Sequence, residues 1–424
     1  MMNTRPSTLP VRISGQRGAI AIVVALSLVV MLGMLGLAID GGRLYVNQAE
    51  LQSAADSCAL AAAAELVCDG VGICPTTYLQ NAEAAGQLSG QRNKANLQAG
   101  LVSISAADIL FNTTLGPNSG YLSRAGGASP NSRFAMCKTR TNGITPWLMG
   151  LLGIGASNVN ATGVATLAPG QTFCSAAPIG VCKKPGGVAP NYGYAVGEWI
   201  SSNFASGGGN DNVTGGFQWV DFTPNAGGAN ETRDQLYGRG QACSLTAGGN
   251  VQTNLGAQQG AKFAYNTRFG LYQNGANAET AATAPPDRTG YAYPNKNPGS
   301  PLIGVGTSAY ADYRARQSSN TAFTQNQYNG GNPSGNVNNA SDYLTYGTER
   351  RLIPVAMIDC TAGNTVPILS MACILMLNPM GNGANGTLYT EYRGPANSST
   401  SPCRSSGLPG GGGGSGPLVP TLVQ

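Results

Sequence analysis

Histidine is absent from the 424 residues, and only 10% of them are charged. Without an imidazole, the Ser-His-Asp and Cys-His catalytic arrangements, the His-containing zinc sites and the usual proton shuttle at neutral pH cannot form. A hydrolase would have to use a Ser-Lys pair or paired carboxylates, and no local motif marks such groups. We therefore expect that the protein is not an enzyme and that it has no metal site and no cofactor.

Basic runs are also lacking, although the net charge is +5. Nucleic-acid binding normally needs a basic patch or an aromatic-basic stripe. We therefore expect no nucleic-acid partner, and no small-molecule substrate can be identified. The abundant residue is glycine, with 61 copies, which predicts long loops around modest cores.

Residues 19–39 form an apolar run of 21 residues without a charge. At 1.5 Å per residue, a helix of that length crosses the hydrocarbon core of a bilayer, which is roughly 30 Å thick. Arg5, Arg12 and Arg17 precede the run, so the positive-inside rule places residues 1–17 in the cytoplasm, 18–39 in the membrane and the remainder outside. A cleaved signal peptide is the alternative. We favour a retained anchor because signal peptides usually carry only 7 to 15 apolar residues.

All ten cysteines follow the apolar run, on the expected outer side. An even number in an oxidising compartment favours disulfides over a metal site, which would need clustered CxxC spacing. The connectivity stays open, and Cys68/Cys74, Cys174/Cys182 and Cys360/Cys373 are the nearest candidate pairs in the chain. The candidate disulfide cysteines are Cys58, Cys68, Cys74, Cys137, Cys174, Cys182, Cys243, Cys360, Cys373 and Cys403.

Residues 40–67 continue in strong helix formers, which predicts that one helix extends out of the membrane. Apolar and small residues recur there at steps of three and four, so one helix face needs a contact surface. That surface is either the protein's own outer domain, which we favour, or another protein. The candidate contact face consists of Leu44, Gln48, Leu51, Ala55, Cys58, Ala62 and Leu66.

Several motifs in this region resemble the N-terminal part of TadG-like proteins of the Tad (tight adherence) Flp pilus assembly systems. They are Gly36-Leu37-Ala38-Ile39-Asp40, Gly42-Arg43-Leu44-Tyr45, Glu50-Leu51-Gln52 and the alanine-rich segments at 54–56 and 59–61. The resemblance implies an inner-membrane protein with a periplasmic body and contacts to pilins, pseudopilins or Tad platform proteins. Residues 133–168 also look like the strand, helix, strand block of such proteins.

Two features depart from the family pattern. Prepilin peptidase substrates of these systems are cut after glycine with glutamate five residues on, whereas a cut after Gly18 would place Val23 there. The DxSxS metal motif of TadG-related von Willebrand A domains is also missing, since Asp56-Ser57-Cys58 does not continue it. We expect an unprocessed protein without a metal-dependent adhesive site.

The predicted fold is α+β: a transmembrane helix continues into a long periplasmic helix packed on a small antiparallel sheet, and a loop-rich, mainly β region follows. We assign residues 68–172 to an α/β pilin-like unit, 173–404 to a Gly/Asn-rich mainly β region and 405–424 to a flexible tail. The alternative for the tail is that its apolar residues 418–423 add a strand elsewhere. Trp147, Leu148, Leu151 and Leu152 are expected in the core, with a membrane-touching patch as the alternative. The tyrosines of residues 264–347 are expected in surface loops.

The predicted function is that of a non-enzymatic, inner-membrane-anchored periplasmic component of Tad/Flp pilus assembly. Its helix and periplasmic domain would contact other subunits of the machinery. The alternative is a processed minor pilin or surface adhesin exposed on the pilus. The sequence identifies neither the direct partner nor the oligomeric state.

Overall fold

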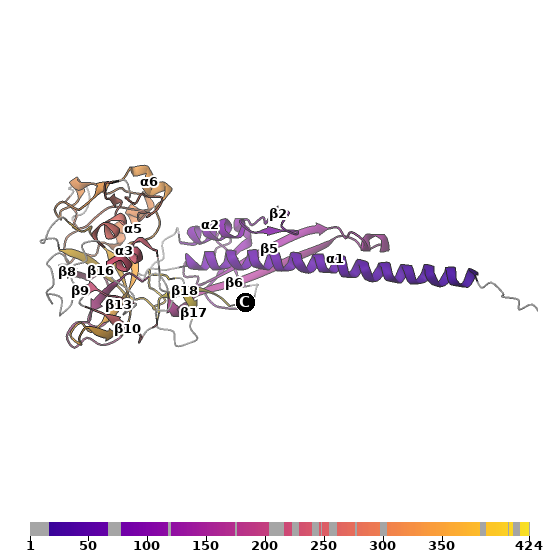
Figure 1. Ribbon diagram of the computed structural model, residues 1–424, viewed down its shortest axis with the longest axis horizontal. Coiled ribbons are helices and arrows are strands. Elements are labelled where there is room, and N and C mark those ends of the chain that lie inside the picture. Colours follow the sequence, from indigo (N-terminus) through magenta and orange to yellow (C-terminus); the bar gives the residue numbers. More distant parts are fainter. Residues whose placement is uncertain are drawn as a thin grey trace, which may run out of the picture.

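The computed structural model describes residues 17–66, 78–117, 120–173, 176–202, 216–222, 229–239, 246, 248–253, 261–275, 278–296, 303–381, 387–405, 407–409 and 416–423. A helix of 48 residues, α1 (Arg17–Ala64), dominates its N-terminal part. Its N-terminal half projects free of the rest of the protein, and its C-terminal half lies along two long strands (Figure 1). This mixed class, with a long apolar N-terminal helix and a mainly β remainder, confirms the coarse fold prediction.

The proximal module is built around the C-terminal half of α1. Its sheet has the order β17-β6-β5-β3-β4, and all of its pairings are antiparallel. The long strands β5 (Phe134–Ile144) and β6 (Ser157–Phe173) form a hairpin that runs beside α1 (Figure 1). The other elements are α2 (Tyr78–Gly90), β1 (Lys94–Ala95), β2 (Gly100–Leu101), η1 (Ala106–Asp108), β3 (Ile109–Asn112), β4 (Leu122–Ser123) and η3 (Met149–Leu152).

The distal module contains a sheet with the order β8-β16-β15-β13-β7-β9. Its central strand β13 (Leu352–Ile358) is buried along its whole length, because Val355 and Met357 face one core while Leu352 and Ile358 face the other. The remaining sheet strands are β7 (Ile179–Cys182), β8 (Trp199–Ser202), β9 (Phe217–Trp219), β15 (Ser370–Met376) and β16 (Leu388–Pro395).

Short helices and small two-stranded sheets cover the central sheet of the distal module. All but one of them lie in the long segment 229–351, which connects β9 to β13. They are α3 (Ala229–Tyr237), β10 (Asn250–Gln252), α4 (Ala261–Thr267), β11 (Leu271–Tyr272), α5 (Tyr310–Ser318), η4 (Gln325–Gln327), β12 (Asn336–Val337), α6 (Ala340–Thr345) and β14 (Thr365–Pro367).

The expectation of surface-exposed tyrosines in residues 264–347 is wrong for eight of them. Their side chains are buried because their rings pack in the cores while several hydroxyl groups find internal acceptors, as when Tyr343 donates to the Phe269 carbonyl over 2.8 Å. Tyr346 is exposed. The eight are Tyr265, Tyr272, Tyr291, Tyr293, Tyr310, Tyr313, Tyr328 and Tyr343.

The prediction of a flexible tail over 405–424 is also wrong for the part that the structure describes. β17 (Gly407–Pro409) and β18 (Leu418–Leu422) both pair with β6 in the proximal module. β5 pairs with one side of β6, and β17 and β18 pair with the other side. Without β17 and β18, the backbone N–H and C=O groups on that side of β6 would form an open sheet edge. The distal module is therefore an insertion between strands of one sheet, and the boundary predicted after residue 172 falls inside β6.

Among the described residues, α1 is the one helix that is long and apolar enough to cross a membrane. Its large side chains from Ile20 to Leu37 are mostly exposed to solvent. The apolar run of residues 366–377 has twelve residues, too few to cross a bilayer as a helix, and most of it lies in β14 and β15.

Candidate functional site

One face of the C-terminal half of α1 is covered by its own chain. Of the predicted contact face, Leu51, Ala55, Cys58, Ala62 and Leu66 are buried in the proximal core. Leu44 packs partly against that core. Gln48 is exposed, and its side-chain amide donates a hydrogen bond to the Asn160 carbonyl of β6 over 3.0 Å. This face is therefore in contact with the proximal module itself.

Small residues let the strands and α2 approach α1 closely. A Cβ atom on Gly163 of β6 would lie 2.6 Å from Asp56 Oδ1 and 3.0 Å from the Ala55 carbonyl oxygen. Gly90 of α2 similarly leaves room for Ile104 and Cys58. Five alanines of α1 have no exposed surface at this contact: Ala54, Ala55, Ala59, Ala62 and Ala63.

A disulfide fastens the buried face of α1 to the sheet. Cys58 of α1 is bonded to Cys137 of β5, with 6.0 Å between their Cα atoms, and both side chains are fully buried. The bond closes a loop with a sequence separation of 79, so it restricts the unfolded chain strongly.

The other described disulfides follow the sheet register rather than proximity in the chain. Cys182 pairs with Cys360 because the parallel pairing of β7 and β13 sets Cys182 opposite Ile358, two residues before Cys360. Cys373 of β15 pairs with Cys403. The suggested pairs Cys174/Cys182 and Cys360/Cys373 are therefore wrong. Four cysteines lie outside the described residues: Cys68, Cys74, Cys174 and Cys243.

Polar residues of α1 hold backbone groups of the surrounding chain. The Asp40 carboxylate accepts three hydrogen bonds, from the backbone N–H groups of Trp147 (2.8 Å), Leu148 (2.9 Å) and Met149 (2.7 Å). Arg43 donates to the Thr145 carbonyl over 3.0 Å, and its guanidinium carbon lies 4.6 Å from the centre of the Trp147 ring. These contacts fix the end of the β5–β6 hairpin against α1.

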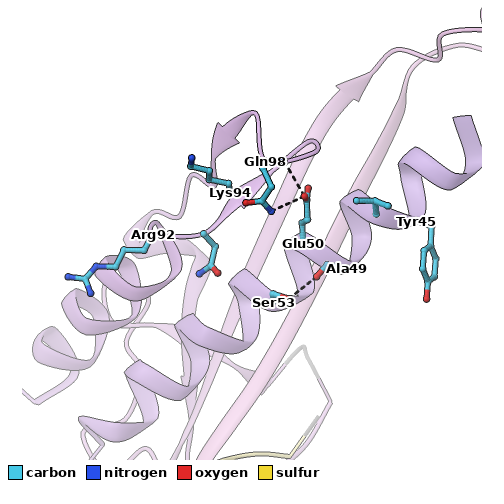
Figure 2. A pocket seen from close by; sticks show the side chains of 9 residues that line it. Tyr45, Ala49, Glu50, Ser53, Arg92, Lys94 and Gln98 are labelled. Carbon is cyan, nitrogen blue, oxygen red and sulfur yellow. Dashed lines mark hydrogen bonds between the residues drawn. The ribbon is translucent and has the colours of Figure 1, made fainter. Parts of the chain in front are cut away.

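The next polar residues of α1 hold a strained turn. Asn96, Leu97 and Gln98 have positive φ angles of 58°, 59° and 62°, which side-chain-bearing residues rarely adopt in succession. Asn47 Oδ1 accepts the Asn96 N–H over 2.9 Å. The Glu50 carboxylate accepts the N–H groups of Leu97 and Gln98 and the Gln98 side-chain amide. Figure 2 shows Glu50 reaching from α1 to Gln98, beside an open groove whose other wall carries Arg92 and Lys94.

An ion-pair chain joins the end of α1 to the distal module. Arg404 bonds Glu65 over 3.0 Å with one guanidinium nitrogen and Glu349 over 3.2 Å with the other. Burial raises the pKa of the Glu65 carboxyl, but the charge and hydrogen bond of Arg404 outweigh burial and lower that pKa below its ordinary value of 4.5. Arg404 lies in the segment that returns from the distal module to β18, so this chain spans the junction of the two modules.

The end of the β5–β6 hairpin departs from the predicted core position. Trp147 is 59% exposed and Ile154 is 45% exposed. Leu148 and Met149 are partly covered because they lie against Gly36 of α1. Of the four residues expected in the core, Trp147 is therefore a wrong assignment and Leu148 is only partly buried. The side chains of Leu151 and Leu152 lie outside the described part of the structure.

Three observations complete the placement of the predicted residues. Arg17 is the first residue of α1, and Arg5 and Arg12 lie outside the described residues. In the described part of the chain, no group of three or more His, Cys, Asp or Glu side chains could hold a metal ion. Helical periodicity did not predict the polar residues of α1 that hydrogen-bond to the surrounding chain. These polar clamps are Asp40, Arg43, Asn47 and Glu50. Three of these four stand within the motifs that carry the family resemblance, and this was the available signal.

The match to known proteins falls on the same helix. Residues 18–65 match the family "Putative Flp pilus-assembly TadE/G-like". No curated protein and no solved structure matches the chain. The matched range covers the exposed apolar half of α1, its polar clamps and its buried alanine face. Over residues 18–65, which lie in α1 and the residue that follows it, the chain is therefore similar to the TadE/G-like Flp pilus-assembly family.

Proposed function

We propose that the protein is a non-enzymatic component of Tad/Flp pilus assembly, anchored in the inner membrane by residues 18–39 with the two modules in the periplasm. The observation that carries the proposal is the division of α1 within the family-matched range. Residues 20–39 expose a continuous apolar surface, whereas the proximal module covers one face of the residues that follow. Exposed apolar surface of this extent needs an apolar environment, and a bilayer provides it at the matching length.

The contact between α1 and the proximal module limits the surfaces that partner proteins could reach. Because the proximal module already covers the buried face of the helix, partners would meet the outer surfaces of the modules and the apolar half of α1. Pilins, pseudopilins and Tad platform proteins are the proposed partners. The absence of histidine from the sequence supports a role through contacts rather than catalysis.

The test introduces charge into the apolar half of α1. Leu28→Glu together with Leu32→Glu should move the protein out of the inner-membrane fraction and abolish surface pili, because each buried carboxylate is costly in hydrocarbon. Leu344→Glu is the matched control, since Leu344 is 73% exposed in α6 of the distal module. This control should leave membrane fractionation and piliation unchanged.

The alternative function, a processed minor pilin or adhesin, gives a different protein. It requires an N-terminus at Ala19 and recovery in sheared pili. Edman or mass-spectrometric sequencing of the purified protein distinguishes the two. Normal piliation in a strain that lacks the gene would contradict the assembly role.

A further inference from the structure

The end of the β5–β6 hairpin lies beside the membrane-spanning part of α1 rather than above it. A Cβ atom on Gly36 would be 3.2 Å from Met149 Cγ and 3.3 Å from Leu148 Cβ. Gly36 precedes the end of the apolar run at Ile39 by three residues, a rise of about 4.5 Å along a helix. Figure 1 shows the hairpin ending part-way along α1, with the apolar half of the helix continuing beyond it. The hairpin end therefore reaches the level at which the span leaves the bilayer.

The chemistry of this segment suits the boundary between lipid and water. The chain carries no charged residue between Arg140 and Lys183, and residues 145–156 read TPWLMGLLGIGA. Trp147 and Ile154 are exposed on it. Tryptophan is enriched at membrane interfaces because its ring is apolar and its N–H is polar. Arg43 lies over the Trp147 ring, four residues beyond Ile39, where an arginine can reach lipid phosphates.

Three backbone N–H groups of the segment already have hydrogen-bond partners, as an apolar environment requires. Backbone N–H groups that enter lipid must be paired, and those of Trp147, Leu148 and Met149 are already bonded to Asp40. The same bonds, with that from Arg43 to Thr145, fix the depth of the segment relative to α1. We propose that residues 145–156 form a second membrane contact, which enters the face of the bilayer from which α1 emerges. The inference rests on the proposed anchor, and lipid is the expected occupant because the contact continues the surface of the span.

The experiment measures the environment of Trp147 in full-length protein reconstituted into phosphatidylcholine/phosphatidylglycerol vesicles. The emission of Trp147 is the difference between the wild type and Trp147→Phe, which leaves the two tryptophans of the distal module in place. Lipids brominated in the upper acyl chain quench from the membrane, and iodide quenches from water. We expect strong quenching of Trp147 by the brominated lipid and little by iodide. Leu344→Trp, read as its difference from the wild type, should show the opposite pattern.

Each other outcome has a distinct meaning. Vesicle flotation reports on the anchor, so protein that fails to float contradicts both the anchor and the hairpin contact. Protein that floats while iodide quenches Trp147 as it quenches the Leu344→Trp reporter contradicts the hairpin contact alone. Protection of Trp147 from both quenchers would mean that another protein surface covers the segment, which also overturns the proposal.

Discussion

Asp40 sets the position of the β5–β6 hairpin along α1. Its two carboxylate oxygens receive three consecutive backbone N–H groups, an arrangement that a neutral amide cannot reproduce because it has only one accepting oxygen. Its neighbour Arg43 bonds Thr145 on the other side of the same turn. Single side chains of α1 therefore determine where a distant segment of chain meets the membrane-proximal helix.

Asp40→Asn should loosen the hairpin end while the proximal core stays folded. At least one of the three N–H groups would lose its partner and face an amide N–H₂ group instead. Hydrogen–deuterium exchange in detergent should show faster exchange at residues 147–149 and unchanged exchange in α2. Asp234→Asn, at a half-exposed carboxylate of the distal module, is the control. Equal protection of residues 147–149 in the variant and the wild type would contradict this role of Asp40.

At position 163 of β6, the close approach of α1 leaves room only for glycine. Any side chain there would meet the backbone of α1, which cannot move aside as a flexible side chain would. Gly163→Ala should lower the free energy of unfolding by about 1–3 kcal/mol, the usual cost of overpacking. Gly116→Ala, where a Cβ atom meets no neighbour within 4 Å, should change it little. Thermal unfolding of the two variants in the same detergent measures the difference.

At the scale of elements, α1 has two environments along one continuous helix. Its first half is predominantly apolar and exposed, and its second half combines a small-residue face, a disulfide and polar side chains that bind the surrounding chain. β6 is its counterpart, since it pairs with β5 on one side and with β17 and β18 on the other. The proximal sheet therefore depends on β17 and β18, which begin 234 and 245 positions after the last residue of β6.

Val419→Asp tests this dependence. Val419 is buried in β18, so an unpaired carboxylate there should cost roughly 3 kcal/mol or more. Val423→Asp, at an exposed position of the same terminal segment, is the matched control. We expect a lower melting temperature of the proximal module only for Val419→Asp. If both variants melt like the wild type, β18 does not contribute to the stability of the sheet.

At the scale of the whole molecule, the distal module is joined to the proximal module by two chain connections, because it is inserted between β6 and β17. Arg404 reinforces the second connection by binding Glu65 at the end of α1 and Glu349 of the distal module at once. The modules are thus linked by covalent topology and by a partly buried ion-pair chain.

The junction should respond to acid. The folded-state pKa of Glu65 is below its ordinary value of 4.5, so the stabilisation from its charge is fully present above that value and is lost as the pH falls through the lowered folded-state value. Wild type and Glu65→Gln should therefore differ in melting temperature at pH 7 and converge in acid. Asp234→Asn, at a half-exposed carboxylate of the distal module, controls for the loss of a carboxylate away from the junction. A Glu65→Gln difference that is unchanged at pH 3 would contradict the ion-pair chain.

The sequence by itself determined the features that depend on local pattern. The uncharged run of residues 19–39, the helical spacing that follows it and the motifs from Gly36 to Gln52 sufficed to predict a long α1 and the pilus-assembly family. Helical periodicity and apolar length are properties of neighbouring residues, so they can be read without a fold.

Only the tertiary structure decided which distant segments meet. The disulfides Cys182–Cys360 and Cys373–Cys403, the return of β18 to β6 and the burial of the tyrosines all follow from strand register and chain connectivity. The partners of Asp40 lie more than 100 residues away in the chain. Cysteines and strands that are close in the chain would pair at a lower entropy cost, because short loops cost less entropy to close. The extra cost of a long loop grows only slowly with its length. The free energy gained by burying the two cores therefore outweighs it.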